Sequence, residues 1–134
     1  MRLHIPMILA AAALAAIPAT ASARERLAPE DQLAKLLEGR VAGEPQNCIP
    51  LSMARSSQVI DKTAIVYRVG STLWVNRPEG GASSLDDDDI LVTRLSGSQL
   101  CSIDAVQLHD RSSNMYSGFV SLGKFVPYRR VKGE

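Results

Sequence analysis

The chain has 134 residues, a length that limits it to one small domain. Its aromatic content is low and its charge is almost balanced. Residues 1–23 contain a single cation, Arg2, and no acid, so the remainder carries 14 basic and 14 acidic side chains. A surface with this balance gives no electrostatic attraction to nucleic acid or to anionic lipid. Neither is therefore an expected partner.

The first 23 residues have the pattern of a cleaved signal peptide. Arg2 provides the positive start, residues 5–17 form an apolar run, and Ala21-Ser22-Ala23 matches the small-residue site that signal peptidase reads. The alternative, a retained membrane anchor, needs about 20 apolar residues, more than this run supplies. We therefore expect cleavage between Ala23 and Arg24, a periplasmic or secreted protein, and no stable membrane insertion after cleavage.

Residues 24–46 are predicted to form a short helix followed by a linker. Pro29 suits the first helical position, and Gly39 suits the stop. Three leucines between them make one narrow apolar stripe, which favours packing against the rest of the domain, with partner binding as the alternative. The stretch Arg40–Pro50 is rich in Gly and Pro and reads as a connecting loop.

The most informative stretch is Thr63 to Arg77, which predicts a β-hairpin. Two β-rich runs, Ala64–Val69 and Thr72–Arg77, flank Gly70-Ser71, and glycine at the first central position is typical of a type II′ turn. In that register Tyr67 lies opposite Trp74. Side chains alternate along a strand, so one face of the hairpin would carry Ile65, Tyr67, Val69 and Trp74.

We expect that face to be the buried one. The opposite face is also apolar, so the reverse arrangement stays open. In that case a solvated Trp74, with Tyr67 opposite it, would mark a partner-binding site, because exposed aromatic side chains often lie in contact surfaces.

The remaining β-rich runs complete a mainly β domain over residues 47–131. They are Ser57–Ile60, Ile90–Leu95, Gln99–Leu108 with a bulge near Ser102–Asp104, and Phe119–Tyr128, with a surface loop over His109–Gly118 and a basic tail from Arg129. We expect roughly five to seven antiparallel strands arranged as a small barrel or sandwich.

Cys48 and Cys101 are the only cysteines, so only one intramolecular pairing exists. An exported protein meets an oxidising environment, which favours a structural disulfide. The alternative is a redox-active or metal-binding thiol pair. The long spacing, and the lack of a C-x-x-C pattern or a neighbouring histidine, argue against it.

The sequence contains no motif that predicts catalysis, a cofactor or a metal site. Beyond the predicted signal peptide His109 is the only histidine, and the run Asp86–Asp89 lacks the spacing of a calcium loop and is expected to be solvated. The alternative to a binding protein is a small periplasmic hydrolase. It would use His109 or a carboxylate pair drawn from Asp61, Asp104 and Asp110.

Several short motifs resemble those of a family of small exported proteins from Gram-negative bacteria that has no assigned function. They are Asn47-Cys48-Ile49, Leu100-Cys101-Ser102-Ile103-Asp104 and Leu122-Gly123-Lys124-Phe125, with the hairpin between them. The resemblance implies an exported, disulfide-bonded β domain and brings no catalytic residues. The relatives' second cysteine pair, near Ala82 and before Leu122, has no counterpart here.

Together these observations favour a non-enzymatic binding or interaction module. Its partner would be an unknown protein or small ligand of the cell envelope. An accessory envelope protein without a small ligand is the third possibility.

Overall fold

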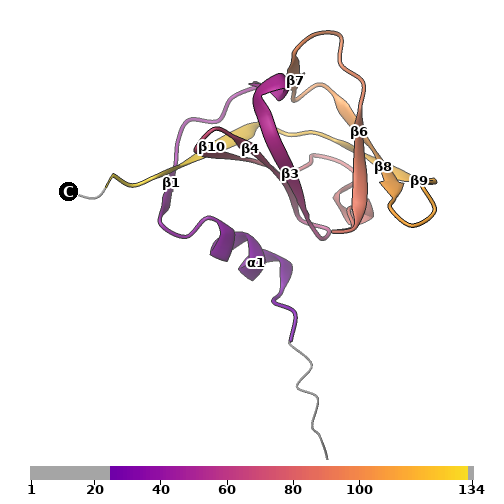
Figure 1. Cartoon of the computed structure of the whole chain (residues 1–134), viewed down its shortest axis with the longest axis horizontal. Coiled ribbons are helices and arrows are strands. Elements are labelled where there is room, and N and C mark those ends of the chain that lie inside the picture. Colours follow the sequence, from indigo (N-terminus) through magenta and orange to yellow (C-terminus); the bar gives the residue numbers. More distant parts are fainter. Residues whose placement is uncertain (1–24, 133–134) are drawn as a thin grey trace, which may run out of the picture.

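The computed structural model describes residues 25–132, and this part of the chain is mainly β, with one α-helix beside three antiparallel sheets (Figure 1). In chain order the elements are α1 (Pro29–Leu36), β1 (Arg40–Ala42), β2 (Cys48–Pro50), the 3₁₀ turn η1 (Leu51–Met53), β3 (Ala54–Ile60), β4 (Ala64–Val69), β5 (Thr72–Asn76), the 3₁₀ turn η2 (Ala82–Ser84), β6 (Asp89–Thr93), β7 (Gln99–Cys101), β8 (Ala105–Asp110), β9 (Tyr116–Ser121) and β10 (Phe125–Arg130). The predicted signal peptide and its cleavage site lie outside the described residues. Within them, no helix is both long and apolar enough to cross a membrane.

The sheets form a sandwich and do not close into a barrel within the described residues. The largest has the strand order β1-β10-β5-β4-β3, the second pairs β6-β8-β9, and the third is the short pair β2-β7. The mainly β class and the single short helix are confirmed. Among residues 25–132 there are ten strands, more than the sequence predicted.

The central hairpin has the predicted register. Tyr67 lies opposite Trp74, and Val66 opposite Val75. Gly70 has φ +58°, whereas Ser71 has no positive φ, which fits a type II′ turn.

Both faces of this hairpin are buried, one against each of its neighbouring layers. The predicted face packs against the two smaller sheets, and its fully buried or nearly buried members are Ile65, Tyr67 and Trp74. The other face packs under α1, where Leu33 meets Val66, Leu73 and Val75. Helix α1 is therefore a third layer, and its leucine stripe is part of the core, as expected.

Two predicted long strands are each split in two, and the split places their halves in different sheets. The run from Gln99 divides at Asp104, whose carboxylate accepts a hydrogen bond from the Cys101 N–H at 2.8 Å. The run to Tyr128 divides at Leu122–Lys124. The first break lies at the predicted bulge, but it is a complete turn.

Three further predictions of loop or tail are wrong. β1 and β2 lie inside the predicted linker Arg40–Pro50, and β1 is an edge strand of the main sheet. The predicted loop His109–Gly118 is shortened because β8 runs to Asp110 and β9 begins at Tyr116. The basic residues Arg129 and Arg130 are in β10, paired with β1.

The predicted disulfide is present. Cys48 and Cys101 lie directly opposite each other in the β2–β7 pair and are joined by a bond between their Sγ atoms. This pair of strands covers one end of the sandwich, so the disulfide holds together segments that are far apart in sequence. A disulfide is consistent with an oxidising compartment.

The Asn76 side chain fixes the backbone at the second break, Leu122–Lys124, through two hydrogen bonds that we call the Asn76 clasp. The amide of Asn76, fully buried, donates to the Gly123 carbonyl at 2.7 Å and accepts from the Gly123 N–H at 3.0 Å. A Cβ added at Gly123 would lie 2.4 Å from the Arg77 carbonyl oxygen, so only glycine fits there. Asn76 thus replaces the strand pairing that the chain loses at this point.

Asn76→Ala should lower the free energy of unfolding by about 3 kcal/mol, because two buried backbone groups of Gly123 would lose their partner. Urea denaturation measures this change. The exposed Asn47→Ala is the matched control and should leave stability unaltered. Equal stability of the two variants would contradict the role assigned to the clasp.

Candidate functional site

Two edge strands of different sheets face each other across an open groove. β3 is the last strand of the five-stranded sheet and β6 the last of the three-stranded sheet, and neither has a second partner strand among the described residues. Figure 1 shows the two strands side by side on one flank of the molecule, nearer at one end than at the other. We name the space between them the β3–β6 groove.

Backbone hydrogen bonds close the groove at both ends. At one end the Lys62 N–H donates to the Leu85 carbonyl at 3.1 Å. At the other the Leu51 N–H donates to the Ser98 carbonyl at 3.0 Å. The edge of β3 is thereby left open only in its central part.

Two adjoining pockets that share Ser57 lie along β3, and the first of them lies in the groove between β3 and β6. The first has a volume of about 340 Å³ and is lined by Ser57, Gln58, Val59, Asp87, Asp89, Ile90, Leu91 and Arg111. The second, of about 220 Å³, is lined by Leu51, Ala54, Arg55, Ser56, Ser57 and Tyr67. Pockets of this size accommodate one or two side chains of a bound chain.

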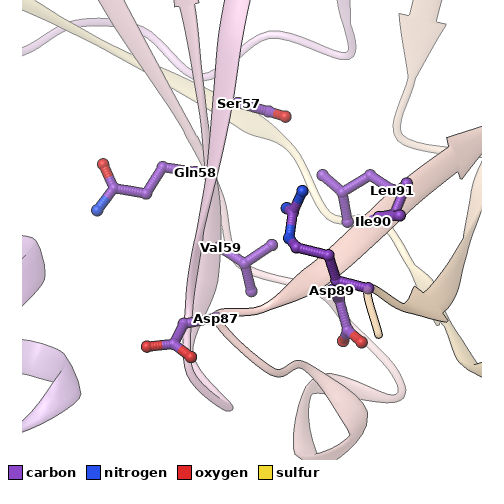
Figure 2. A pocket seen from close by; sticks show the side chains of 8 residues that line it. Ser57, Gln58, Val59, Asp87, Asp89, Ile90 and Leu91 are labelled. Carbon is purple, nitrogen blue, oxygen red and sulfur yellow. The ribbon is translucent and has the colours of Figure 1, made fainter. Parts of the chain in front are cut away.

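The side chains along β3 alternate between the groove and the opposite face. Figure 2 shows Ser57 and Val59 on the side of the strand that faces β6, whereas Gln58 points the other way. Leu91 of β6 lies across from them in the same view. The first pocket is therefore lined by both apolar and polar side chains, with the strand edges at its sides.

The acidic residues at one end of the groove are held by separate partners. Asp87 forms a salt bridge with Arg26 at 3.1 Å and Asp88 one with Arg111 at 3.1 Å. Asp89 is buried and accepts hydrogen bonds from the Asp86 N–H at 2.9 Å and from the Ser117 hydroxyl at 3.2 Å. Of the run Asp86–Asp89, which was predicted to be solvated, the first three side chains are exposed and Asp89 is buried.

Tyr67 brings an unusual polar group to the second pocket. Its side chain is only 3 % exposed, and its hydroxyl, itself buried, has no hydrogen-bond partner among the described residues. Burial raises the pKa of this phenol, so the group remains a neutral donor. A buried hydroxyl without a partner costs stability, and a bound water, ion or ligand can satisfy such a group.

The aromatic pair proposed from the sequence is not on the surface. Trp74 is 7 % exposed and packs in the core, so the solvated Trp74 that would have marked a binding site is not found. Tyr67 is among the residues that line the second pocket, although its hydroxyl oxygen is buried. Tyr116 and Phe119 of β9 are the exposed aromatic side chains instead, and they lie in or beside the predicted loop.

The groups of the alternative hydrolase are not brought together. The Nδ1 atom of His109 lies 3.4 Å from the Asn114 carbonyl, its ring packs edge-to-face on Tyr116, and no serine or carboxylate hydrogen-bonds to it among the described residues. Asp104 and Asp110 lie at opposite ends of β8. Hydrogen bonds from Ser112 and Ser113 lower the pKa of Asp110 to about 2.

Residues 25–132 contain no cluster of three or more His, Cys, Asp or Glu side chains placed to hold a metal ion. The Asp61 carboxylate contacts the neighbouring Lys62 instead. Among the described residues, Asp61, Asp104 and Asp110 each hydrogen-bond to a different partner and not to one another.

Sequence reasoning missed the groove because it depends on which strands are left at the sheet edges. The polar run Ser56-Ser57-Gln58 beside a buried Val59 was the available indication, since polar edge strands are typical where a strand faces solvent. No known family model matches the chain, and no curated protein or solved structure is significantly similar to it.

Proposed function

We propose that the mature protein is an exported, periplasmic, non-enzymatic binding module that holds an extended peptide segment in the β3–β6 groove. Export rests on the signal-peptide pattern of residues 1–23, and the Cys48–Cys101 disulfide supports it. The resemblance to small exported Gram-negative proteins agrees with this compartment. The partner would be a protein of the cell envelope.

The observation that carries the proposal is the buried, unpartnered hydroxyl of Tyr67 beside an unpaired strand edge. An edge strand presents free N–H and C=O groups, and an added strand satisfies them. The hydroxyl would donate to a carbonyl of that added strand. Alternate side chains of the peptide would then enter the two pockets, which gives specificity.

The length of the groove fits a short segment. β3 has seven residues and would span about 23 Å. A bulge between Ala54 and Ser56 interrupts the regular register near one end. The regular edge therefore runs from Ser56 to Ile60, enough for four or five residues of a partner strand.

A random dodecapeptide library displayed on phage tests the proposal. Peptides selected on the wild-type protein should bind Tyr67→Phe about threefold to tenfold more weakly, because one hydrogen bond to the ligand is removed. Tyr67→Phe itself should be as stable as the wild type, since the hydroxyl has no internal partner to lose. Tyr116→Phe removes an exposed phenol outside the groove and should bind the peptides normally.

A second variant blocks the groove by filling it. Ser57 lines both pockets and is exposed, so Ser57→Leu should abolish peptide binding without unfolding the protein. Ser83→Leu, at an exposed site in η2, is its control. Peptides that bind Ser57→Leu and Tyr67→Phe as tightly as they bind the wild type would overturn the proposal. A library that yields no binder would overturn it as well.

A further inference from the structure

A second surface, on the other face of the main sheet, gathers three arginines near the β4–β5 turn. Arg40 of β1 lies directly opposite Arg130 of β10. Arg68 of β4 is on the same face, because it is two residues from Val66, which packs under α1. Figure 1 shows β1, β10 and β4 in the sheet that α1 covers.

Arg40 is held in position by the backbone. Its Nη1 atom donates to the Ser71 carbonyl at 2.8 Å and to the Tyr128 carbonyl at 3.1 Å. Ser71 is in the hairpin turn, so the guanidinium lies between the edge strand and the end of β4. Its Nη2 and Nε groups make no hydrogen bond within the described residues and remain available as donors.

The three guanidinium groups have no carboxylate partner in the described part of the chain. Other cations of the described residues, such as Arg55 and Arg94, also lack a salt bridge, and what sets these three apart is that they gather on one face of the sheet. Like charges directly opposite each other on antiparallel strands destabilise the pair. Burial, and then the charges of Arg130 and Arg68, lower the pKa of Arg40, and no acid offsets them.

We propose that Arg40, Arg68 and Arg130 form a binding site for a phosphate group that carries more than one negative charge. Guanidinium groups match the oxygens of a phosphate in geometry and charge, and several can share one group. A lone carboxylate would neutralise only one of the three. The site goes beyond peptide binding in the groove, since it uses none of the groove residues.

The overall charge balance does not oppose such a site. Screening limits the reach of each charge to about 8 Å at physiological ionic strength. Arg130 is the direct cross-strand neighbour of Arg40, about 5 Å away at the backbone, and the Arg40 guanidinium reaches the Ser71 carbonyl in the turn that follows β4, where the charge of Arg68 also acts on it. The local charge, and not the total, therefore governs binding at this place.

Isothermal titration calorimetry with inorganic pyrophosphate tests the site on the full mature chain. The wild type should bind, and Arg68→Gln and Arg130→Gln should each weaken binding by about tenfold. Both variants should remain folded without ligand, because they remove repulsion and no internal hydrogen bond. Arg94→Gln changes the same charge at an exposed position outside the cluster and should bind like the wild type.

Vesicles distinguish the source of the phosphate. Cosedimentation with phosphatidic acid vesicles that is lost in Arg68→Gln assigns the site to a lipid headgroup, whereas binding of pyrophosphate alone assigns it to a soluble anion. Equal weakening in Arg94→Gln would show general charge attraction and overturn the proposal. An absence of binding in both arms would overturn it as well.

Discussion

Removal of the Cys48–Cys101 disulfide should lower the free energy of unfolding by about 4 kcal/mol, more than any single side chain of the surface could contribute. The bond closes a loop of 53 residues in sequence separation, and closing a loop of that length restricts the unfolded chain strongly. It also joins β2 to β7, a pair of strands with only three residues each. A domain of this size depends on such a cross-link.

Urea denaturation of Cys48→Ala/Cys101→Ala against the oxidised wild type measures this difference. The double variant avoids a free thiol, and the wild type in reducing buffer provides an independent version of the same comparison. Buried Ile49 and Leu100, the opposed neighbours of the cysteines, should keep the variant's core intact at low temperature. A midpoint within 0.3 M of the wild type, on the order of 0.5 kcal/mol for a typical slope, would contradict a stabilising role.

Trp74→Ala should lower the free energy of unfolding by about 4 kcal/mol, because it removes the largest side chain of the core. Trp74 is 7 % exposed and lies between Tyr67 and Pro127 of the neighbouring strands. The Arg129 guanidinium lies 5.9 Å from its ring centroid and closes that side of the core.

Thermal and urea unfolding of Trp74→Ala and Trp74→Phe together check the argument. Phenylalanine retains most of the buried area, so its loss should be less than half that of alanine. A loss below 1 kcal/mol for Trp74→Ala would mean that the ring is in solvent. That result would restore the aromatic pair as a candidate contact surface.

The sequence was most informative where structure is decided locally. The β4–β5 hairpin was predictable because Gly70 dictates the turn, and the turn then sets the register of Tyr67 and Trp74. The disulfide followed from there being only two cysteines. Helix α1 followed from Pro29 and a leucine stripe.

The breaks between strands could not be predicted, because distant residues decide them. Asp104 ends β7 by binding the Cys101 N–H, and Asn76 ends the following run through Gly123, which is far away in sequence. The sequence indicated only a bulge at the first break, so a single long strand was predicted there and another across the second. The burial of both hairpin faces likewise required knowing that α1 covers one of them.

The candidate site depends on the same long-range information. The groove exists because β3 and β6 are edges of different sheets, a property of strand order that no short motif encodes. The importance of the Tyr67 hydroxyl lies in the lack of a partner, which only the folded arrangement reveals. The burial of the Tyr67 side chain in the core could be predicted from the hairpin, whereas its position beside a pocket could not.

Amide hydrogen exchange followed by NMR, with and without a selected peptide, tests most directly whether the β3–β6 groove binds an extended segment. If the groove binds the peptide, the amides of Ser56–Ile60 on the free edge of β3 will exchange more slowly when the peptide is bound, while those of β9 will be unchanged. Slower exchange confined to Tyr116–Ser121 would contradict it. It would place the binding surface on the exposed aromatic side chains of β9 instead.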